Sequence, residues 1–228
     1  MKRTGKPGGD PDRAQALTQY RQRAAVYDLE LALFEPIRRM AIARLALQRG
    51  DVVLDVGCGT GLSLVLLRQG IGARGGIIGI DQSPEMIEKA RERVVQNHWK
   101  NVTLLCSPVE LADIPGLADA VLFHFTHDIL RRPDAIANVV HHLKPQARVV
   151  ASGIKWSWFI PVNPFVWSAA WHSVTTLEGL DKPWSRLAAR IGPVDVETLL
   201  LDTVYIASGT LRAKRGRSST RGRHALDL

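Results

Sequence analysis

The sequence predicts an α/β protein built on a doubly wound sheet of seven strands, most of them parallel. Two observations carry this prediction. Between residues 52 and 153, short apolar runs alternate with helix-type patterns, and a glycine-rich turn over residues 57–61 directly follows the first run. Such alternation produces a parallel sheet with right-handed crossovers and helices on both faces. Ligands of such sheets bind at the carboxyl ends of the strands.

The predicted strands are short runs of apolar and β-branched residues. Five lie in the alternating region, at Val52–Val56, Gly76–Ile80, Val102–Cys106, Ala120–Phe125 and Ala147–Gly153. Two more, Val194–Leu201 and Thr203–Ala207, flank Asp202 closely enough to form a C-terminal hairpin. That hairpin would add an antiparallel edge to the sheet.

Helix-type patterns separate these strands, at Leu62–Gln69, Pro84–Asn97, Val109–Leu111 and Pro133–Leu143. The helix predicted at Pro84–Asn97 has the clearest start. Ser83 can cap it, Pro84 suits its first turn, and Glu85 lies at the positive end of the helix dipole. Upstream, residues 14–47 show helical patterning that we expect to break near Pro36.

One domain is expected, since 228 residues bury one good core and two domains would be cramped. We expect a flexible N-terminal tail over residues 1–13, a single domain over residues 14–211 and a basic disordered tail over residues 212–228. Within the domain, residues 154–190 end the alternation and form a Trp-rich insert. Its five tryptophans are Trp156, Trp158, Trp167, Trp171 and Trp184.

The formal net charge is +8, and the last seventeen residues contribute a net +5 of it. No aromatic residues interleave the arginines of this tail, and this disfavours a nucleic-acid partner because base stacking needs such residues. A solvated extension and a contact with anionic lipid headgroups stay open for it. No apolar run approaches the ~20 residues of a membrane span, and no secretory or transit signal is present. We therefore expect a cytoplasmic protein, with peripheral membrane contact as the alternative; no pattern indicates an oligomeric state.

Cysteine usage predicts neither a disulfide framework nor a zinc site. Cys58 and Cys106 are the two cysteines of the chain, and two are too few for either. We expect both to be free thiols.

Asp55 places a carboxylate at the end of a predicted buried strand, just before the glycine turn. A dinucleotide fingerprint would have its third glycine where this chain has Leu62, and no Lys-Ser or Lys-Thr follows the glycines as in a phosphate-binding loop. The carboxylate would also repel phosphates. The turn therefore predicts a ligand with a cationic group, and we expect Asp55 to face water when that ligand is absent.

A second acid, Asp81, ends the next strand 24 residues after Gly57. This is near the spacing of about 20 for the acid that accepts hydrogen bonds from ribose hydroxyls. The polar turn over residues 106–110 closes the third strand. Together these strand ends predict a ligand with an adenosine ribose, a cationic group and no phosphate.

These motifs resemble the class I S-adenosylmethionine-dependent methyltransferases of the small-molecule, methyltransferase type 11-like kind, which have a Rossmann-like fold. The resemblance rests on Val53-Leu54-Asp55-Val56-Gly57-Cys58-Gly59-Thr60-Gly61, Gly79-Ile80-Asp81-Gln82-Ser83, Ala118-Asp119-Ala120-Val121-Leu122 and Leu143-Lys144-Pro145. It runs from about Tyr20 to Ala207. The chain departs from the family at Gln146-Ala147, where Gly-Gly is common.

The resemblance implies S-adenosyl-L-methionine as cofactor and S-adenosyl-L-homocysteine as product. Asp55 would orient the methionine ammonium, Asp81 would accept the ribose hydroxyls, and the three glycines would let the backbone approach. The full implied cofactor set is Tyr27, Asp55, Gly57, Gly59, Gly61, Asp81, Gln82, Met86, Ser107, Val109 and His124. Core packing stays open as the alternative for Tyr27 and Met86.

The candidate bases follow the fourth strand, where His127 and His124 could accept a proton near neutral pH. The alternatives are that His124 packs beside the cofactor and that Asp128 caps the next segment. Two histidines without further ligands do not make a metal site, so we expect no metal.

The expected substrate pocket is formed by Asp128, Trp156, Trp158, Trp167, Trp171 and His172. Aromatic side chains suit a small, largely apolar molecule such as a lipid, a quinone-like ring or a polyketide-type metabolite. The Tyr27-Asp28 helix followed by Pro36 and Arg38-Arg39 also resembles bacterial phospholipid N-methyltransferases, which is the alternative. A nucleic-acid methyltransferase is disfavoured because this chain has Phe-Thr-His-Asp where such enzymes usually have a catalytic tetrapeptide or a cysteine nucleophile. A non-catalytic binding module is disfavoured because the chain keeps both the glycine turn and the second acid.

Overall fold

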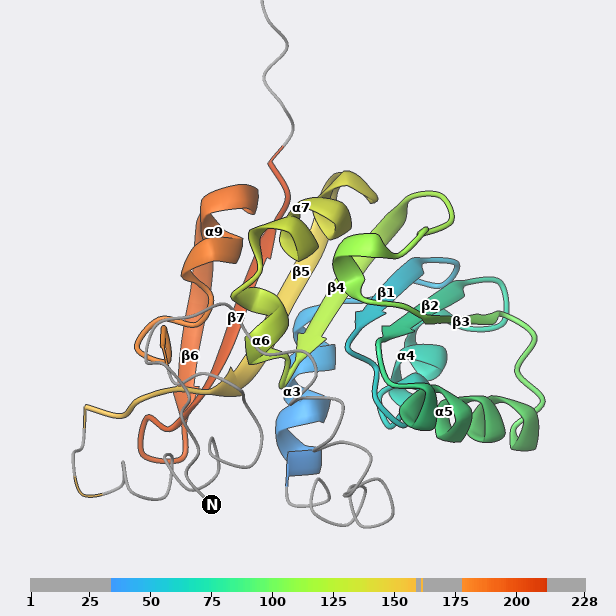
Figure 1. Cartoon of the computed structure of the whole chain (residues 1–228), viewed down its shortest axis with the longest axis horizontal. Helices are drawn as coiled ribbons and strands as arrows, with labels where there is room; N and C mark the ends of the chain where they lie inside the picture. The colour runs from blue at the N-terminus through green and yellow to red at the C-terminus, as the bar shows by residue number, and fades with distance from the viewer. Residues whose placement is uncertain (1–33, 159–160, 162–177, 213–228) are drawn as a thin grey trace, which may run out of the picture.

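The computed structural model describes residues 34–158, 161 and 178–212. Its centre is a seven-stranded sheet in the order β3-β2-β1-β4-β5-β7-β6 (Figure 1). The strands are β1 Val52–Val56, β2 Gly76–Asp81, β3 Val102–Cys106, β4 Ala118–His124, β5 Leu143–Ile154, β6 Val194–Leu199 and β7 Val204–Thr210.

The five strands β3, β2, β1, β4 and β5 are parallel to their neighbours. Strand β7 runs antiparallel to both β5 and β6, so the C-terminal hairpin closes this edge of the sheet. This confirms the predicted α/β sheet, mostly parallel with an antiparallel C-terminal hairpin.

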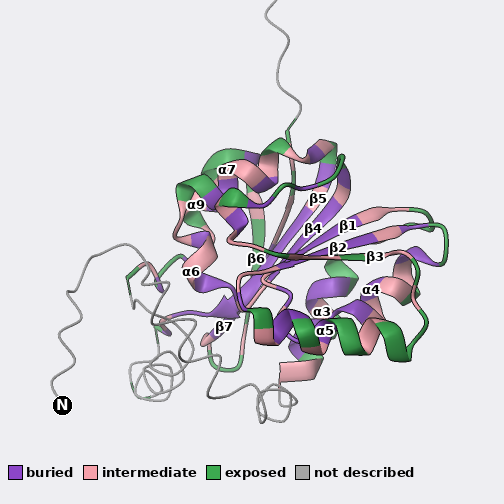
Figure 2. Cartoon of the chain, turned by 45° about the vertical axis from the view of Figure 1, so that its right-hand side comes forward, coloured by how far each residue is buried: buried purple, intermediate pink, exposed green. Residues whose placement is uncertain are grey.

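Helices cover both faces of the sheet (Figure 1). They are α3 Glu35–Arg44, α4 Leu64–Ile71, α5 Pro84–Gln96, the 3-10 helix η2 Val109–Leu111, α6 His127–Leu130, α7 Pro133–His141 and α9 Ser185–Ile191. Alternate strand residues point to opposite faces, so β1 sends Val53 into the core shared with α3 and α4, and Leu54 into the core shared with α7 and α9. The central strands β1, β2 and β4 are consequently among the most buried parts of the molecule (Figure 2).

Several predicted bounds differ from the structure. Pro36 occupies the first turn of α3, where its missing N–H needs no partner, and the expected break before it falls on residues outside the described ones. Helix α9 was not predicted; it begins inside the expected insert over residues 154–190 and ends just past it at Ile191. Gln146 has a φ of 64°, a left-handed conformation that glycine adopts most readily.

The order of the strands reverses beside β1, since β2 and β3 lie on one side of it and β4 on the other. A crevice at the carboxyl ends of β1 and β4 is where open sheets of this type bind ligands. Asp55 lies next to the last residue of β1, and His124 is the last residue of β4. The fold thus places both side chains at its expected binding position.

Some expectations fall on parts of the chain that lie outside the described residues. These are the N-terminal tail over residues 1–13, nearly all of the basic tail over residues 212–228, Tyr27, Trp167, Trp171 and His172. Among the helices that are described, none is long and apolar enough to cross a bilayer. Both cysteines are free thiols; Cys58 is buried and Cys106 is exposed.

Candidate cofactor site

The glycine turn after β1 has a backbone that requires glycine. Gly57, Gly59 and Gly61 have φ values of 68°, 55° and 80°, a region that residues with a side chain rarely adopt. A Cβ atom on Gly57 would also come within 2.5 Å of Cγ2 of Thr126. The N–H groups of Gly57 and Cys58 donate to the carbonyl of Ile80 at 2.7 and 3.0 Å, which fixes the turn against β2.

Asp81 orders the other side of the same turn. Its Oδ2 accepts from the Gly59 N–H and its Oδ1 from the Ser83 N–H, both at 2.9 Å. Burial raises the pKa of Asp81, while these backbone hydrogen bonds oppose the rise. Each carboxylate oxygen has a second lone pair, and the side chain is partly exposed, so Asp81 can also accept two ribose hydroxyls.

Asp55 is buried, with 2% of its surface exposed. The expectation that it faces water was therefore wrong, because the turn and the neighbouring strands close over it. Its Oδ2 atom has no hydrogen-bond partner. Burial raises the pKa of Asp55 to about 7, against the effect of the Arg38 charge and with a further contribution from Asp81. An unsatisfied buried carboxyl is costly, and a cationic ligand group would remove that cost.

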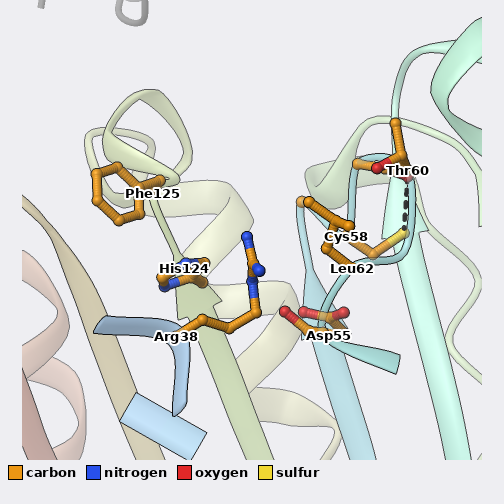
Figure 3. Close-up of a pocket in the computed structure, with 10 residues that line it drawn as sticks. Arg38, Asp55, Cys58, Thr60, Leu62, His124 and Phe125 are labelled. Atoms are coloured by element: carbon orange, nitrogen blue, oxygen red, sulfur yellow. Dashed lines mark hydrogen bonds between the residues drawn. The ribbon is translucent and has the colours of Figure 1, made fainter. Parts of the chain in front are cut away.

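The pocket beside Asp55 is lined by ten residues: Arg38, Asp55, Gly57, Cys58, Gly59, Thr60, Leu62, Ser63, His124 and Phe125. Figure 3 shows the Arg38 side chain extending between His124 and Asp55. Arg38 comes from α3 and is 2% exposed. The sequence interpretation assigned it no role in the cofactor site. One sequence signal could have pointed to Arg38. It lies at helical spacing on the same face of α3 as the buried residues Ile37, Ala41 and Ile42.

His124 reaches the pocket from β4. Its Nδ1 atom lies 2.7 Å from Oγ of Ser152, and its Nε2 atom is buried without a hydrogen-bond partner. Burial, with the nearby Arg38 charge, lowers the pKa of His124 to about 3. The imidazole is therefore neutral at physiological pH.

His127 lies outside the ten lining residues of this pocket. It is the first residue of α6 and is 6% exposed. Its Nε2 atom donates to the carbonyl of Glu178 at 3.1 Å, because a carbonyl can only accept. Asp128 follows it in α6 and is partly exposed. The two candidate bases thus occupy different environments.

The residues expected around the adenine lie at the ends of β2 and β3. Gln82 and Ser107 are partly exposed, and the Ser107 N–H donates to the Asp81 carbonyl at 3.0 Å. Met86 and Val109 are 1% and 4% exposed. The Ser107 hydroxyl donates to the Pro108 carbonyl at 3.0 Å. Contact of these side chains with adenine stays a prediction.

Two tryptophans of the expected substrate pocket lie within the described residues. Trp156 is half-buried, packs against Ile154 and Leu180, and donates its backbone N–H to the Leu180 carbonyl at 2.8 Å. Trp158 is 80% exposed. Their contact with a substrate stays a prediction.

Comparison with known proteins identifies the domain. Residues 53–146 match the family profile described as a methyltransferase domain. The chain contains a class I S-adenosylmethionine-dependent methyltransferase domain. This confirms the resemblance, and the cofactor of the domain is S-adenosylmethionine. The buried, unpartnered Oδ2 of Asp55 and the glycine backbone at Gly57 fit that cofactor, which carries an ammonium group and no phosphate.

Two curated relatives are similar over part of their length. The chain is 28% identical over 130 residues to "Aklanonic acid methyltransferase DauC" of Streptomyces sp. (strain C5), covering 56% of this chain and 58% of the relative. It is 32% identical over 127 residues to "Ubiquinone/menaquinone biosynthesis C-methyltransferase UbiE" of Citrifermentans bemidjiense, covering 54% of this chain and 53% of the relative. The chain thus spans little more than half of either relative.

Solved structures share the fold. An O-methyltransferase family protein from Burkholderia thailandensis has a TM-score of 0.68 at 17% identity, covering 93% of this chain and 66% of that one. N-methyltransferase NodS from Bradyrhizobium japonicum, solved with S-adenosyl-L-homocysteine, has a TM-score of 0.58 at 18% identity, covering 78% of this chain and 87% of that one.

Proposed function

We propose that this protein transfers a methyl group from S-adenosylmethionine to a small, largely apolar molecule. The observation that carries the proposal is the pocket at the carboxyl ends of β1 and β4, where Asp55 and His124 meet. Two relatives support the substrate class, since their names refer to aklanonic acid and to ubiquinone and menaquinone.

The bound cofactor would supply an electrophilic methyl group on a sulfonium. The acceptor atom would bond to that methyl carbon as the carbon–sulfur bond breaks, with the electron pair left on the sulfur. Because positive charge disperses in this in-line displacement, the chain's main task is to hold the two reactants in line. Asp55, Asp81 and the glycine turn would fix one reactant, and His124, which lines the same pocket, would contact the other.

His124 is our candidate for contact with the acceptor. In the tautomer in which Nδ1 donates to Ser152 Oγ, the Nε2 lone pair is left for an acceptor proton. A pKa of about 3 makes this imidazole a weak base. It therefore favours acceptors that react as anions or lose their proton after methyl transfer.

A methyl-transfer screen tests the proposed function. Purified protein would be incubated with S-adenosylmethionine radiolabelled at the methyl group and with separate pools of quinones, phenols, amines and phospholipids. We expect transfer to a pool of small apolar acceptors, abolished in Asp81→Ala. Binding of S-adenosylhomocysteine without transfer to any pool would instead support a non-catalytic binding module.

The phospholipid alternative has one specific observation in its favour. Trp158, Leu200 and Leu201 are 80%, 60% and 67% exposed. Asp202 joins the two segments, because its Oδ2 accepts from the Trp158 backbone N–H at 3.1 Å. These apolar side chains at one corner could enter a bilayer surface.

Liposome flotation separates the two candidates. Membrane action predicts that Leu200→Ser with Leu201→Ser reduces flotation with phosphatidylglycerol vesicles and lowers methylation of phospholipid. Leu111→Ser is the matched control, because Leu111 is 72% exposed and lies on η2 instead. Equal behaviour of the wild type and both variants would exclude this corner as a membrane contact.

A further inference from the structure

Ser152 is a buried polar residue within an apolar strand. Its neighbours Val149, Val150 and Ala151 in β5 belong to the two cores of the sheet, and Ser152 itself has none of its surface exposed. A buried hydroxyl is costly unless it forms a hydrogen bond. A serine at this position therefore indicates a specific partner.

That partner is His124, the last residue of β4. The Oγ atom of Ser152 lies 2.7 Å from Nδ1 of His124, and the two residues lie opposite one another in the parallel pairing of β4 with β5. The Ser152 carbonyl also accepts from the Phe125 N–H at 2.8 Å. The side chain and the backbone of Ser152 thus both hold the end of β4 in place.

The contact with Ser152 determines which edge of the imidazole faces the pocket. His124 lines the pocket, and its Nε2 atom is buried without a hydrogen-bond partner. If the ring rotated by half a turn about its Cβ–Cγ bond, Nδ1 would leave Ser152 and a ring carbon would take the place of Nε2. The hydrogen bond therefore keeps a polar ring atom available to a ligand.

The charge of Arg38 decides which nitrogen of the neutral ring carries the proton. The serine hydroxyl can donate or accept, so by itself it is compatible with both tautomers. Figure 3 shows the Arg38 side chain extending between His124 and Asp55. Its charge adds to burial in lowering the pKa of His124, so it acts on this ring. Because a cation attracts a lone pair and repels an N–H group, the favoured tautomer has its proton on Nδ1 and its lone pair on Nε2.

We propose that Ser152 is a positioning residue: its hydroxyl accepts a hydrogen bond from Nδ1 of His124 and thereby directs the Nε2 lone pair at the methyl acceptor. An acceptor that carries a proton on the atom to be methylated, such as a hydroxyl, an N–H or an acidic C–H group, could then donate to Nε2. A tertiary amine or a thioether could not, because neither has such a proton. The inference rests on the proposed function, since it concerns the acceptor of that same reaction.

NMR of the imidazole nitrogens tests the tautomer without measuring activity. The chain has seven histidines, so comparison with His124→Gln assigns the signals of His124. In the ligand-free protein we expect a proton on Nδ1 and none on Nε2. Ser152→Ala should shift both signals, because Nδ1 loses its partner and the ring is free to rotate, and Ser152→Thr should restore them because threonine keeps the hydroxyl. A wild-type protein with its proton on Nε2 would overturn the inference.

A second buried serine provides the matched control. Ser157 is 6% exposed, and its hydroxyl donates to the Leu201 carbonyl at 2.7 Å, outside the ten residues that line the pocket. At saturating S-adenosylmethionine, Ser152→Ala should lower the rate of transfer to the responding acceptor pool about 2- to 10-fold, the range of one neutral hydrogen bond. Ser157→Ala should leave the rate unchanged. The affinity for S-adenosylhomocysteine, measured by calorimetry, should be unchanged in both variants.

The remaining outcomes are also decisive. Signals of His124 that stay unchanged in Ser152→Ala would show that Ser152 does not fix the ring, and would overturn the inference. A loss of affinity for S-adenosylhomocysteine as large as the loss of rate would assign Ser152 a structural role and overturn it as well. If Ser152→Ala does not fold, the wild-type tautomer and Ser152→Thr carry the same test. Absence of S-adenosylhomocysteine binding to a wild type with the expected His124 tautomer would overturn the proposed function instead, which distinguishes the two failures.

Discussion

The backbone N–H of Gly59 donates a hydrogen bond of 2.9 Å to Oδ2 of Asp81. This contact joins the glycine turn that follows β1 to the acid that ends β2. This bond therefore links the part of the site assigned to the cofactor's methionine end to the part assigned to its ribose. A change at Asp81 should affect both.

Asp81→Ala should lower the affinity for S-adenosylhomocysteine at least about 100-fold, since it removes an acceptor of two hydroxyls and a support of the turn. Calorimetry measures the loss. Asp113→Ala is the control, because Asp113 is an exposed acid outside the pocket. Undiminished binding in Asp81→Ala would contradict the ribose assignment.

The affinity for S-adenosylhomocysteine should rise as the pH increases from 5 to 8. The pKa of Asp55 is about 7 without ligand, and an ammonium partner favours the ionised form, so binding releases a proton near neutral pH. Calorimetry in buffers of different ionisation enthalpy detects this proton. The release should disappear in Asp55→Asn; its persistence there would assign the proton to another group.

Asp55→Asn should stabilise the ligand-free protein, and more so at pH 8 than at pH 5. The folded-state pKa of about 7 exceeds the ordinary aspartate pKa of 3.8, so stability is lost as the pH rises towards 7 and Asp55 ionises. A neutral amide avoids that loss. The gain should differ between the two pH values by about 1–3 kcal/mol, since one pKa unit corresponds to about 1.4 kcal/mol. Chemical denaturation at each pH measures it.

Asp202→Asn provides a control of opposite sign for that measurement. Burial acts to raise the pKa of Asp202, but hydrogen bonds from Lys155 and the Trp158 backbone lower it overall. Its ionised form therefore contributes stability that is lost as the pH falls. Asp202→Asn should destabilise the protein, and a stabilising effect at pH 8 would contradict the assignment.

Gly57→Ala should destabilise the protein by more than Gly116→Ala. Both glycines have a φ near 70°. A Cβ on Gly57 would lie 2.5 Å from Cγ2 of Thr126, whereas no atom of the described residues lies within 4 Å of a Cβ on Gly116. The left-handed backbone conformation alone should lower the free energy of unfolding of either alanine variant by about 1–2 kcal/mol. Thermal unfolding compares the variants. Adding Thr126→Ala should recover part of the excess loss, and equal losses at the two glycines would show that the clash relaxes freely.

The rate of methyl transfer at saturating cofactor should show no inflection from His124 between pH 5 and 8. The pKa of about 3 keeps this imidazole neutral throughout that range. A pH profile of kcat for the wild type and His124→Gln checks it. An inflection near pH 6.5 that is present in the wild type and absent in His124→Gln would contradict the environment described for His124.

The sheet was predictable because its strands are short apolar runs bounded by glycines and polar turns. Both β1 and β3 have the predicted bounds. The last strand was placed too early. Leu200, Leu201 and Asp202 all have positive φ values and form the turn, so β7 begins at Val204. Helix α9 was missed because it buries only Leu187 and Ile191, too few positions for a helical period to stand out beside the tryptophans.

The sequence by itself determined the acid before the glycine turn and the acid that ends β2, since a glycine spacing and a strand end are local properties of the chain. Only the tertiary structure decided which other groups meet them. Arg38 joins the pocket because α3 packs on the sheet beside β4 and β5, and no local pattern specifies that neighbour. His124 lines the pocket and His127 does not, because β4 ends at His124 and the chain then turns at Phe125 with a φ of 57°.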